Sequence, residues 1–310
     1  MGNQAAAGAG IRHVAWLYRG PGEFVAGVRE FAATAEPVLV AVPAARLPAG
    51  LAGDDATVLD VEELGRNPAR IMPSLRAFAQ AHPDRGVRVL AELAWPGRSA
   101  AELGEVARYE SMLEYAFAGH TMTIMCSYNE AELADSVISA ARISHPRLLR
   151  GGREFDSGDY RSVLDGHGMA PPLLAPATAR KLTYQRDLRP VRALVAAAAA
   201  EAGLPAGRCT DLLIAVSEVA ANTLKHTSGG GTVRVWMTAD EVLCQLDDSG
   251  HILDPLAGYA LPGDDEPGGH GLWLVNQVCD LAEIRSSELG TTVRLHMYRQ
   301  PPRSGLVTAG

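Results

Sequence analysis

Three segments in the last third of the chain hold residue types that could bind a nucleotide together. In the helix expected over Arg208–His226, the polar residues Glu218, Asn222 and His226 follow one another at intervals of four. Four residues turn a helix by about 40° beyond one full turn, so these side chains form a polar stripe beside the apolar face. The amide oxygen of Asn222 suits Mg²⁺, and Glu218 offers a carboxylate to the same ligand. A solvated helix face is the alternative interpretation.

A carboxylate also stands at the end of an expected strand. Asp248 follows Leu246 and Asp247 and comes just before Gly250, a turn residue. In this position the carboxylate can accept a hydrogen bond from an exocyclic amine such as adenine N6. A polar turn at a strand end explains the same residues, so this segment is not specific by itself.

The third segment is a glycine-rich turn that opens into an apolar helix. Gly268, Gly269 and Gly271 lead into this helix, which continues with Leu272. Free backbone N–H groups at a helix N-terminus attract anions, and glycines let phosphate oxygens approach the backbone closely. Taken alone, the pattern is a weak indication of a phosphate site.

The elements that must position these residues favour an α+β sandwich, with helices on one face of a mostly antiparallel sheet. The expected strands are Lys181–Arg186, Thr232–Thr238, Glu241–Asp247 and Thr291–Tyr298, and the expected helices are Val191–Ala202, Arg208–His226 and Leu272–Cys279.

The first half of the chain has a different pattern, in which strands alternate with helices. Such alternation predicts an α/β fold with a mainly parallel sheet. The expected strands are Val38–Pro43, Val87–Leu93 and Met122–Tyr128, and the expected helices are Ser99–Ala118 and Glu130–Arg142.

A linker separates the two patterns. Gly166–Thr178 holds three prolines and two glycines, which block regular backbone hydrogen bonding and add backbone freedom. We therefore expect a first domain over residues 11–155, a linker over 156–178 that is too flexible to act as a rigid lever, and a second domain over 179–300.

Composition narrows the classes of function. The net charge is −8 and the basic residues form no block, so binding to nucleic acid is not expected. The sequence has no apolar run of 18 residues and no signal-peptide pattern at its start. The four cysteines are widely spaced without a C-x-x-C pair, so we expect neither a disulfide framework nor a zinc site, and a reducing cytoplasm fits.

In their order along the chain, the three nucleotide segments resemble a known superfamily. Glu218-x-x-x-Asn222, Asp248-x-Gly250 and Gly269-x-Gly271 resemble the N, G1 and G2 boxes of the GHKL, or Bergerat-type, ATPases. The stretch over 179–300 is similar to the anti-sigma-factor serine-kinase branch of that superfamily.

The resemblance implies an ATP–Mg²⁺ site and a role for each matching residue. Asn222 would bind Mg²⁺, Asp248 would hold adenine, and Glu218 would be the general base that deprotonates an acceptor hydroxyl. The remaining implied nucleotide contacts are His226, Gly250, Leu272 and the Gly268–Gly271 turn, with Ser249–His270 as the ATP lid. One departure is Ile252, which stands where the first glycine box usually has its second glycine, and this puts tight phosphate binding in doubt.

The first half resembles the MEDS sensory domain of DcmR-type regulators. The matching residues are His13-Val14-Ala15-x-x-Tyr18, Arg108-Tyr109-Glu110, Cys126-x-Tyr128 and His145-Pro146. Together, the two domains resemble the RsbA family of anti-sigma regulators.

A sensory pocket is expected where the parallel strands end, because ligands of open α/β sheets bind beyond the carboxyl ends of the strands. Its expected residues are His13, Trp95, Cys126, Tyr128 and His145. For three of them a structural role is the alternative: Cys126 as a small buried hydrophobe, Trp95 in packing and His145 as a helix cap.

The leading hypothesis is a cytoplasmic anti-sigma regulator. It would bind ATP–Mg²⁺ and a sigma factor, and it would phosphorylate a serine or threonine of an anti-sigma antagonist under control of the sensory domain. The sequence leaves open whether the chain forms a homodimer. The alternatives are a non-catalytic, ATP-dependent binding module that sequesters a transcription regulator, and a plain ATPase without a protein acceptor.

Overall fold

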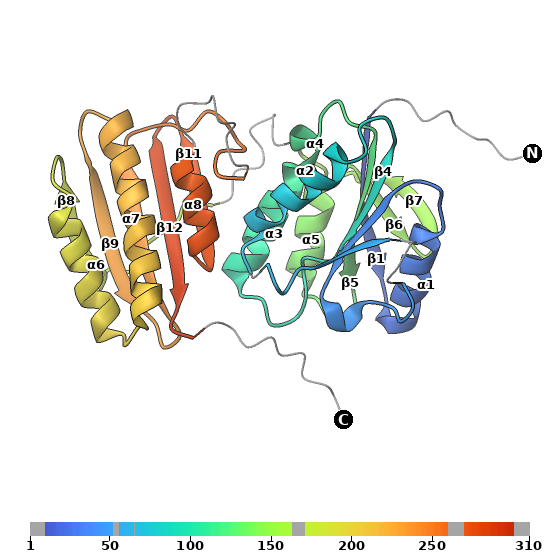
Figure 1. Ribbon diagram of the computed structural model, residues 1–310, viewed down its shortest axis with the longest axis horizontal. Helices are drawn as coiled ribbons and strands as arrows, with labels where there is room; N and C mark the ends of the chain where they lie inside the picture. The colour runs from blue at the N-terminus through green and yellow to red at the C-terminus, as the bar shows by residue number, and fades with distance from the viewer. Residues whose placement is uncertain (1–9, 52–55, 65, 163–170, 260–269, 301–310) are drawn as a thin grey trace, which may run out of the picture. The chain divides into compact units, whose positions relative to one another are not determined.

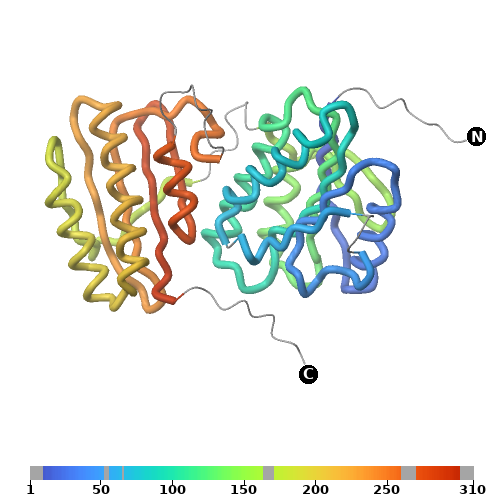
Figure 2. The backbone as a smooth tube through the Cα atoms, viewed as in Figure 1, coloured from blue at the N-terminus to red at the C-terminus, as the bar shows by residue number. Residues whose placement is uncertain are grey.

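The computed structural model describes residues 10–51, 56–64, 66–162, 171–259 and 270–300. The chain divides into two compact units, Met1–Met169 and Ala170–Gly310, whose elements are labelled in Figure 1 and whose backbone is traced in Figure 2. Within the described residues, no helix is long and apolar enough to cross a membrane.

The first unit contains β1 (Ile11–Tyr18), α1 (Gly20–Ala32), β2 (Val38–Val42), η1 (Ala44–Arg46), β3 (Thr57–Asp60), η2 (Pro68–Arg70), α2 (Met72–Gln80), β4 (Val87–Ala91), α3 (Ala100–Ser111), α4 (Leu113–Ala116), β5 (Met122–Asn129), α5 (Asp135–Ser144), β6 (Arg147–Arg150) and β7 (Arg153–Asp156). The second unit contains β8 (Arg180–Tyr184), α6 (Arg189–Glu201), α7 (Ala206–His226), β9 (Gly231–Met237), β10 (Glu241–Asp248), α8 (His270–Val278), β11 (Leu281–Ser287) and β12 (Gly290–Tyr298).

The sheet of the first unit has the strand order β3-β2-β4-β5-β1-β6-β7. Its strand pairs are parallel except β6–β7, which is antiparallel. Helices α2, α3 and α5 cover one face and α1 lies on the other (Figure 1). Strands covered on both faces must be apolar almost throughout, which explains the uninterrupted apolar run of β2. The expected α/β fold with a mainly parallel sheet is confirmed.

The sheet of the second unit has the order β11-β12-β10-β9-β8, and all its pairs are antiparallel. Helices α6, α7 and α8 pack on one face (Figure 1). Alternate residues of the strands, such as Val233 and Val235 or Val293 and Leu295, point into the core beneath these helices. The expected α+β sandwich is confirmed.

Two expected helices in the first unit differ from the structure. The helix expected from Glu130 begins only at Asp135, because the side chain and carbonyl of Asn129 hold residues 131–133 in turns. The helix expected over Ser99–Ala118 is divided at Met112 into α3 and α4.

Part of the predicted linker is attached to the second sheet. The carbonyl oxygen of Leu173 accepts a hydrogen bond from Gln245 at 3.2 Å, and that of Leu174 accepts one from Arg294 at 3.0 Å. Both donors lie on the sheet face opposite the helices. Residues 166–170 of the linker lie outside the described residues, but from residue 171 the chain follows this open face.

The same open face holds a buried histidine between two carboxylates. His296 of β12 is hydrogen bonded through Nδ1 to Glu241 at 2.8 Å and through Nε2 to Glu283 at 2.9 Å. Burial opposes the charged imidazolium, but hydrogen bonds to the two carboxylates outweigh burial and raise the pKa of His296 to about 9. The protonated ring therefore bridges β10 and β11 through β12 at neutral pH.

This bridge makes the stability of the second unit depend on pH. The folded pKa of His296 lies above the unfolded value of 6.5, so its stabilisation is fully present below about pH 6.5 and is lost as the pH rises through about 9. We expect urea unfolding to show a loss on the order of 2 to 3 kcal/mol across this window. The loss should be absent in His296→Gln and retained in the control His226→Gln, whose histidine is exposed. An unchanged pH profile in His296→Gln would contradict the assignment.

Candidate functional site

The first turn of α8 lies directly against α7 at Gly271. A Cβ atom at this position would lie 2.9 Å from Glu218 Oε2 and 3.3 Å from Asn222 Nδ2. Both distances are too short for a side chain other than glycine without a local shift. Glu218, Asn222 and Gly271, which the sequence predicted to act together, therefore meet at one point.

Asp248, at the end of β10, is held by two hydrogen bonds. Its Oδ2 accepts one from the Thr223 hydroxyl at 2.6 Å, and its Oδ1 accepts one from the backbone N–H of Gly250 at 2.7 Å. The Thr223 oxygen in turn accepts a bond from the Tyr184 hydroxyl at 3.1 Å. Because Thr223 follows Asn222 on α7, this chain of bonds fixes the carboxylate beside the polar stripe of α7.

Two glycines allow the backbone to turn tightly around Asp248. A Cβ at Gly290, where φ is +133°, would lie 2.4 Å from the carbonyl oxygen of Asp248. A Cβ at Gly250 would lie 3.0 Å from Asp248 Oδ1, and the carbonyl of Gly250 accepts a hydrogen bond from Thr291 at 2.8 Å. The turn after β10 is thus fastened to the start of β12.

The chain that follows this turn folds back onto α8. Asn276 donates a hydrogen bond to the carbonyl of Gly258 at 2.9 Å, and Tyr259 is buried. A Cβ at Gly258 would lie 3.1 Å from Leu272 Cβ. Of the expected lid Ser249–His270, residues 260–269 lie outside the described residues, and they include Gly268 and Gly269.

Ile252, which stands in place of the second glycine of the first glycine box, is held through both its backbone and its side chain. Its backbone N–H donates to Ser286 Oγ at 2.8 Å, and its side chain packs against the core. His226, the last residue of the polar stripe, is the exposed final residue of α7. The stripe therefore runs from half-buried residues beside α8 to solvent.

The first unit buries a cluster of polar side chains beneath α3 and α5. His13 of β1 and Cys126 of β5 lie side by side, with 3.6 Å between Nε2 and Sγ. The ring of His145, at the C-terminal cap of α5, lies 4.0 Å from the His13 ring, centroid to centroid. All three residues are at most 1% exposed.

Two further residues complete this cluster. The Tyr128 hydroxyl donates to the carboxylate of Glu110 on α3, and the Tyr128 ring meets His145 edge to face at 5.9 Å.

Trp95 packs elsewhere, under the guanidinium of Arg98 at 3.7 Å from the ring centroid. Of the five residues expected in a sensory pocket, the structure thus brings four together, beneath the helices instead of on an open rim.

Burial controls the protonation of the cluster. It lowers the pKa of His13 well below the usual value and that of His145 to about 4, so both rings are uncharged at neutral pH. Burial also raises the pKa of Glu110 to about 7 and, together with Glu110, raises that of the Cys126 thiol. His145 also acts as the C-terminal cap of α5, because its Nδ1 lies 2.8 Å from the carbonyl oxygen of Ala141 in the last turn of that helix.

A second polar cluster lies where the parallel strands end. Glu92, which follows β4, is fully buried and accepts a hydrogen bond from the Tyr18 hydroxyl at 2.6 Å. Arg46 forms an ion pair with Glu92 and donates to Glu132 at 2.8 Å. Burial raises the pKa of Glu92 to about 7, although Arg46 and Tyr18 oppose this shift. The sequence analysis did not single out Glu92. Its position inside the apolar run Val87–Leu93 could have indicated a buried functional carboxylate.

Comparison with known families accounts for both units. Residues 12–146 match the family model MEDS, the MEthanogen/methylotroph, DcmR Sensory domain, and residues 183–297 match the histidine kinase-like ATPase domain. The first unit carries a MEDS domain, and the second carries a histidine kinase-like ATPase domain. The two domain resemblances found in the sequence are confirmed.

No curated protein matches the chain. Among the solved structures that match are the RsbU and RsbW domains of Rv1364c from Mycobacterium tuberculosis, with 22% identity and a TM-score of 0.30 over 40% of this chain. The present chain spans 33% of the length of that structure.

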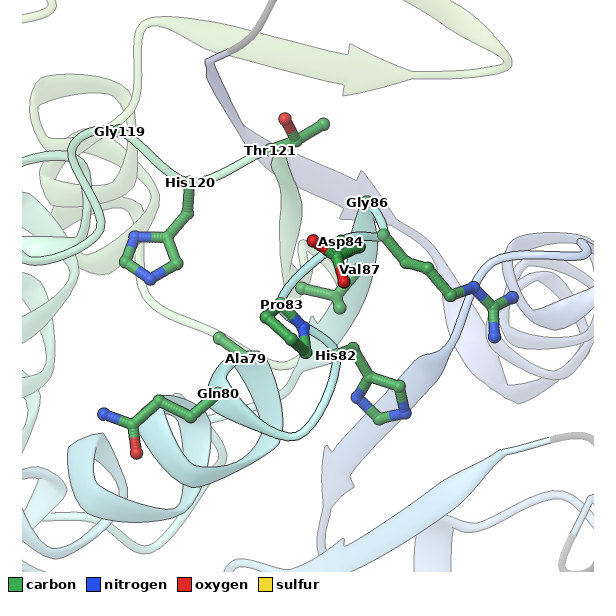
Figure 3. A pocket seen from close by; sticks show the side chains of 11 residues that line it. Ala79, Gln80, His82, Pro83, Asp84, Gly86, Val87, Gly119, His120 and Thr121 are labelled. Carbon is green, nitrogen blue, oxygen red and sulfur yellow. The ribbon is translucent and has the colours of Figure 1, made fainter.

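The MEDS domain has a cavity of about 530 Å³ at the amino-terminal ends of β4 and β5. Its lining includes His82 and His120, whose side chains point in different directions and do not meet (Figure 3). We therefore assign no site to this cavity.

The ATPase domain holds one site residue that the sequence patterns did not single out, Thr223. Its hydroxyl bonds a carboxylate, and such bonds contribute about 1.5 to 3 kcal/mol. We expect Thr223→Val to lower the free energy of unfolding by this amount in urea titrations. Thr210→Val is the matched control, since the exposed Thr210 hydroxyl donates only to the backbone of its own helix. Equal losses in the two variants would contradict a specific role for the bond to Asp248.

Proposed function

We propose that the ATPase domain binds ATP with Mg²⁺ through the stripe on α7. The observation that carries the proposal is the convergence of Glu218 and Asn222 on Gly271, beside the fixed carboxylate of Asp248. The Asn222 amide oxygen would coordinate Mg²⁺, and the N-terminus of α8 would face the phosphates. Gly268, Gly269, Gly271 and Leu272 would line this side of the site.

The base of the nucleotide would lie at the other end of the site, on Asp248. Each oxygen of this carboxylate accepts one hydrogen bond from the protein. Each oxygen keeps a further lone pair that could accept a hydrogen bond from the adenine N6 amine. Gly250 leaves the approach to the carboxylate open because it has no side chain. His226 would contact the nucleotide from the solvent end of α7.

The reaction that suits this site is transfer of the γ-phosphoryl group to a protein hydroxyl. The carboxylate of Glu218 lies one helical turn before Asn222, where it would accept the proton of a serine or threonine as the oxygen attacks phosphorus. The chain would then be a cytoplasmic anti-sigma regulator. Its partners would be a sigma factor and the antagonist that it phosphorylates.

One observation favours a second function, a binding module without catalysis. Ile252 fills the place of a phosphate-binding glycine, and it is anchored by Ser286 and the core. A site that holds the phosphates less firmly would still let ATP order the surface that sequesters a transcription regulator. The two functions differ only in whether phosphate is transferred.

The MEDS domain would supply the signal that regulates the ATPase domain. A cavity of about 390 Å³ lies between α3 and α5, and Tyr128 of the buried cluster forms part of its lining. A small molecule in this cavity would contact the same side chain that bonds Glu110 and packs on His145. The cavity is lined mainly by alanine, valine and leucine, so its ligand would be largely apolar.

Nucleotide binding is tested by the thermal stability of the full chain. MgATP at a hundred times its dissociation constant should stabilise the ATPase domain by about 2.7 kcal/mol, because the ligand binds only the folded state. Asn222→Ala should lose the Mg²⁺-dependent part of the shift, and Asp248→Asn should lose most of the adenine-dependent part. Asp240→Asn, in the exposed β9–β10 turn, should behave like wild type. No shift in wild type at millimolar MgATP would refute the proposal.

Phosphoryl transfer is tested with labelled ATP and the proteins captured by this chain. Glu218→Gln should keep the MgATP thermal shift and lower transfer about 10²- to 10⁴-fold, because the variant cannot take up the acceptor proton. Glu201→Gln is the control, since this exposed carboxylate lies at the end of α6. If wild type transfers no label to any captured protein while ATP still promotes capture, the binding-module function replaces the kinase.

A further inference from the structure

The buried cluster of the MEDS domain brings three metal-ligating side chains to one point. One nitrogen of His13, one nitrogen of His145 and the Sγ of Cys126 all lie within 4.8 Å of one another. Two ligands at about 2.0 and 2.3 Å from a tetrahedral ion lie about 3.5 Å apart. The 3.6 Å between His13 Nε2 and Cys126 Sγ already has this length.

The imidazoles of this cluster have nitrogens that the protein does not satisfy. His145 places Nδ1 on the carbonyl of Ala141 at 2.8 Å, which leaves a lone pair on Nε2, and Nε2 is buried without a hydrogen-bond partner. A histidine that donates one ring N–H to a backbone carbonyl and presents the other nitrogen is the usual arrangement of a metal ligand. His13 Nδ1 is also buried without a partner, and it would carry the proton when Nε2 binds an ion.

We propose that His13, Cys126 and His145 bind one soft or borderline transition-metal ion, Zn²⁺ or Cu⁺, inside the MEDS domain. Two imidazole nitrogens and one thiolate form a donor set that such ions prefer over the hard oxygen-binding cations. The three residues come from β1, β5 and the end of α5, so the ion would join elements that are far apart in the chain. This site is independent of the ATP site proposed above.

Charge distinguishes the two ions. Binding displaces the thiol proton to solvent, so the Cys126 sulfur carries one negative charge and the imidazoles carry none. Cu⁺ then gives a neutral three-coordinate site. Zn²⁺ leaves one positive charge, which the Glu110 carboxylate would neutralise as counter-ion, since Glu110 accepts a hydrogen bond from Tyr128, whose ring packs against His145.

The experiment measures metal content in the full chain, produced in cells grown with added zinc or added copper and then purified without chelator. Wild type should retain about one equivalent of one of the two ions, and Cys126→Ser and His145→Gln should retain at least about ten-fold less. The controls are Cys244→Ser, a fully buried cysteine of the ATPase domain, and His82→Gln, a histidine of the MEDS domain outside the cluster. Glu110→Gln should lose zinc but keep copper.

A spectroscopic measurement on wild type keeps the test decisive if the buried variants do not fold. Protein refolded with Co²⁺ in place of zinc, or charged with Cu⁺, should show the near-ultraviolet absorption of a thiolate–metal bond. Wild type that holds no ion and shows no such absorption overturns the proposal. Folded Cys126→Ser that keeps the wild-type metal content also overturns it, and the 3.6 Å contact is then a hydrogen bond between thiol and imidazole.

Discussion

The ATPase domain depends on how closely the first turn of α8 approaches α7. Because Gly271 has no side chain, the backbone at the start of α8 lies against Glu218 and Asn222. A helix N-terminus carries unpaired N–H groups, and this approach directs them to the same place as a carboxylate and an amide. The adjoining bond from Thr223 to Asp248 fixes the end of β10 beside the polar stripe of α7. One close helix contact and one hydrogen bond therefore position the whole site.

In the MEDS domain, by contrast, the polar side chains lie inside the core, where each of them needs a partner. Central strands of a parallel sheet are covered on both faces, so a polar side chain on β1 or β5 has no access to water. The domain places these side chains in two groups on opposite faces of the sheet. Tyr18 and Trp16 face α1, whereas His13, Cys126 and Tyr128 face Glu110 and His145. Each group meets side chains from other elements, although His13 Nδ1, His145 Nε2 and Glu92 Oε2 stay buried without a hydrogen-bond partner.

Sequence reasoning predicted most elements of the second unit but only part of the first unit. The long helix α7 and strands β2, β4, β5, β9 and β10 were found, because their apolar residues repeat regularly. The inner strand β1, helices α1 and α2, edge strands β3, β7 and β11 and the short β6 were missed. Arg12 and His13 interrupt the apolar pattern of β1, and Glu283 and Arg285 interrupt that of β11. The stripe of α7 was visible from spacing alone. The role of Thr223 and the meeting of His13, Cys126 and His145 were not, because these contacts join residues distant in the sequence; His13 and Cys126, for example, are 113 positions apart.

The hydrogen bonds at Leu173 and Leu174 define where the ATPase domain is attached to the chain that precedes it. Their carbonyls are held by Gln245 in the middle of β10 and by Arg294 of β12, and these two residues lie opposite each other in the sheet. A force on the chain at residue 171 would therefore load these two side-chain hydrogen bonds first. Once they break, the force passes along the chain to β8, the edge strand of the sheet. The attachment thus yields before the sheet does, and its release lengthens the chain that precedes β8.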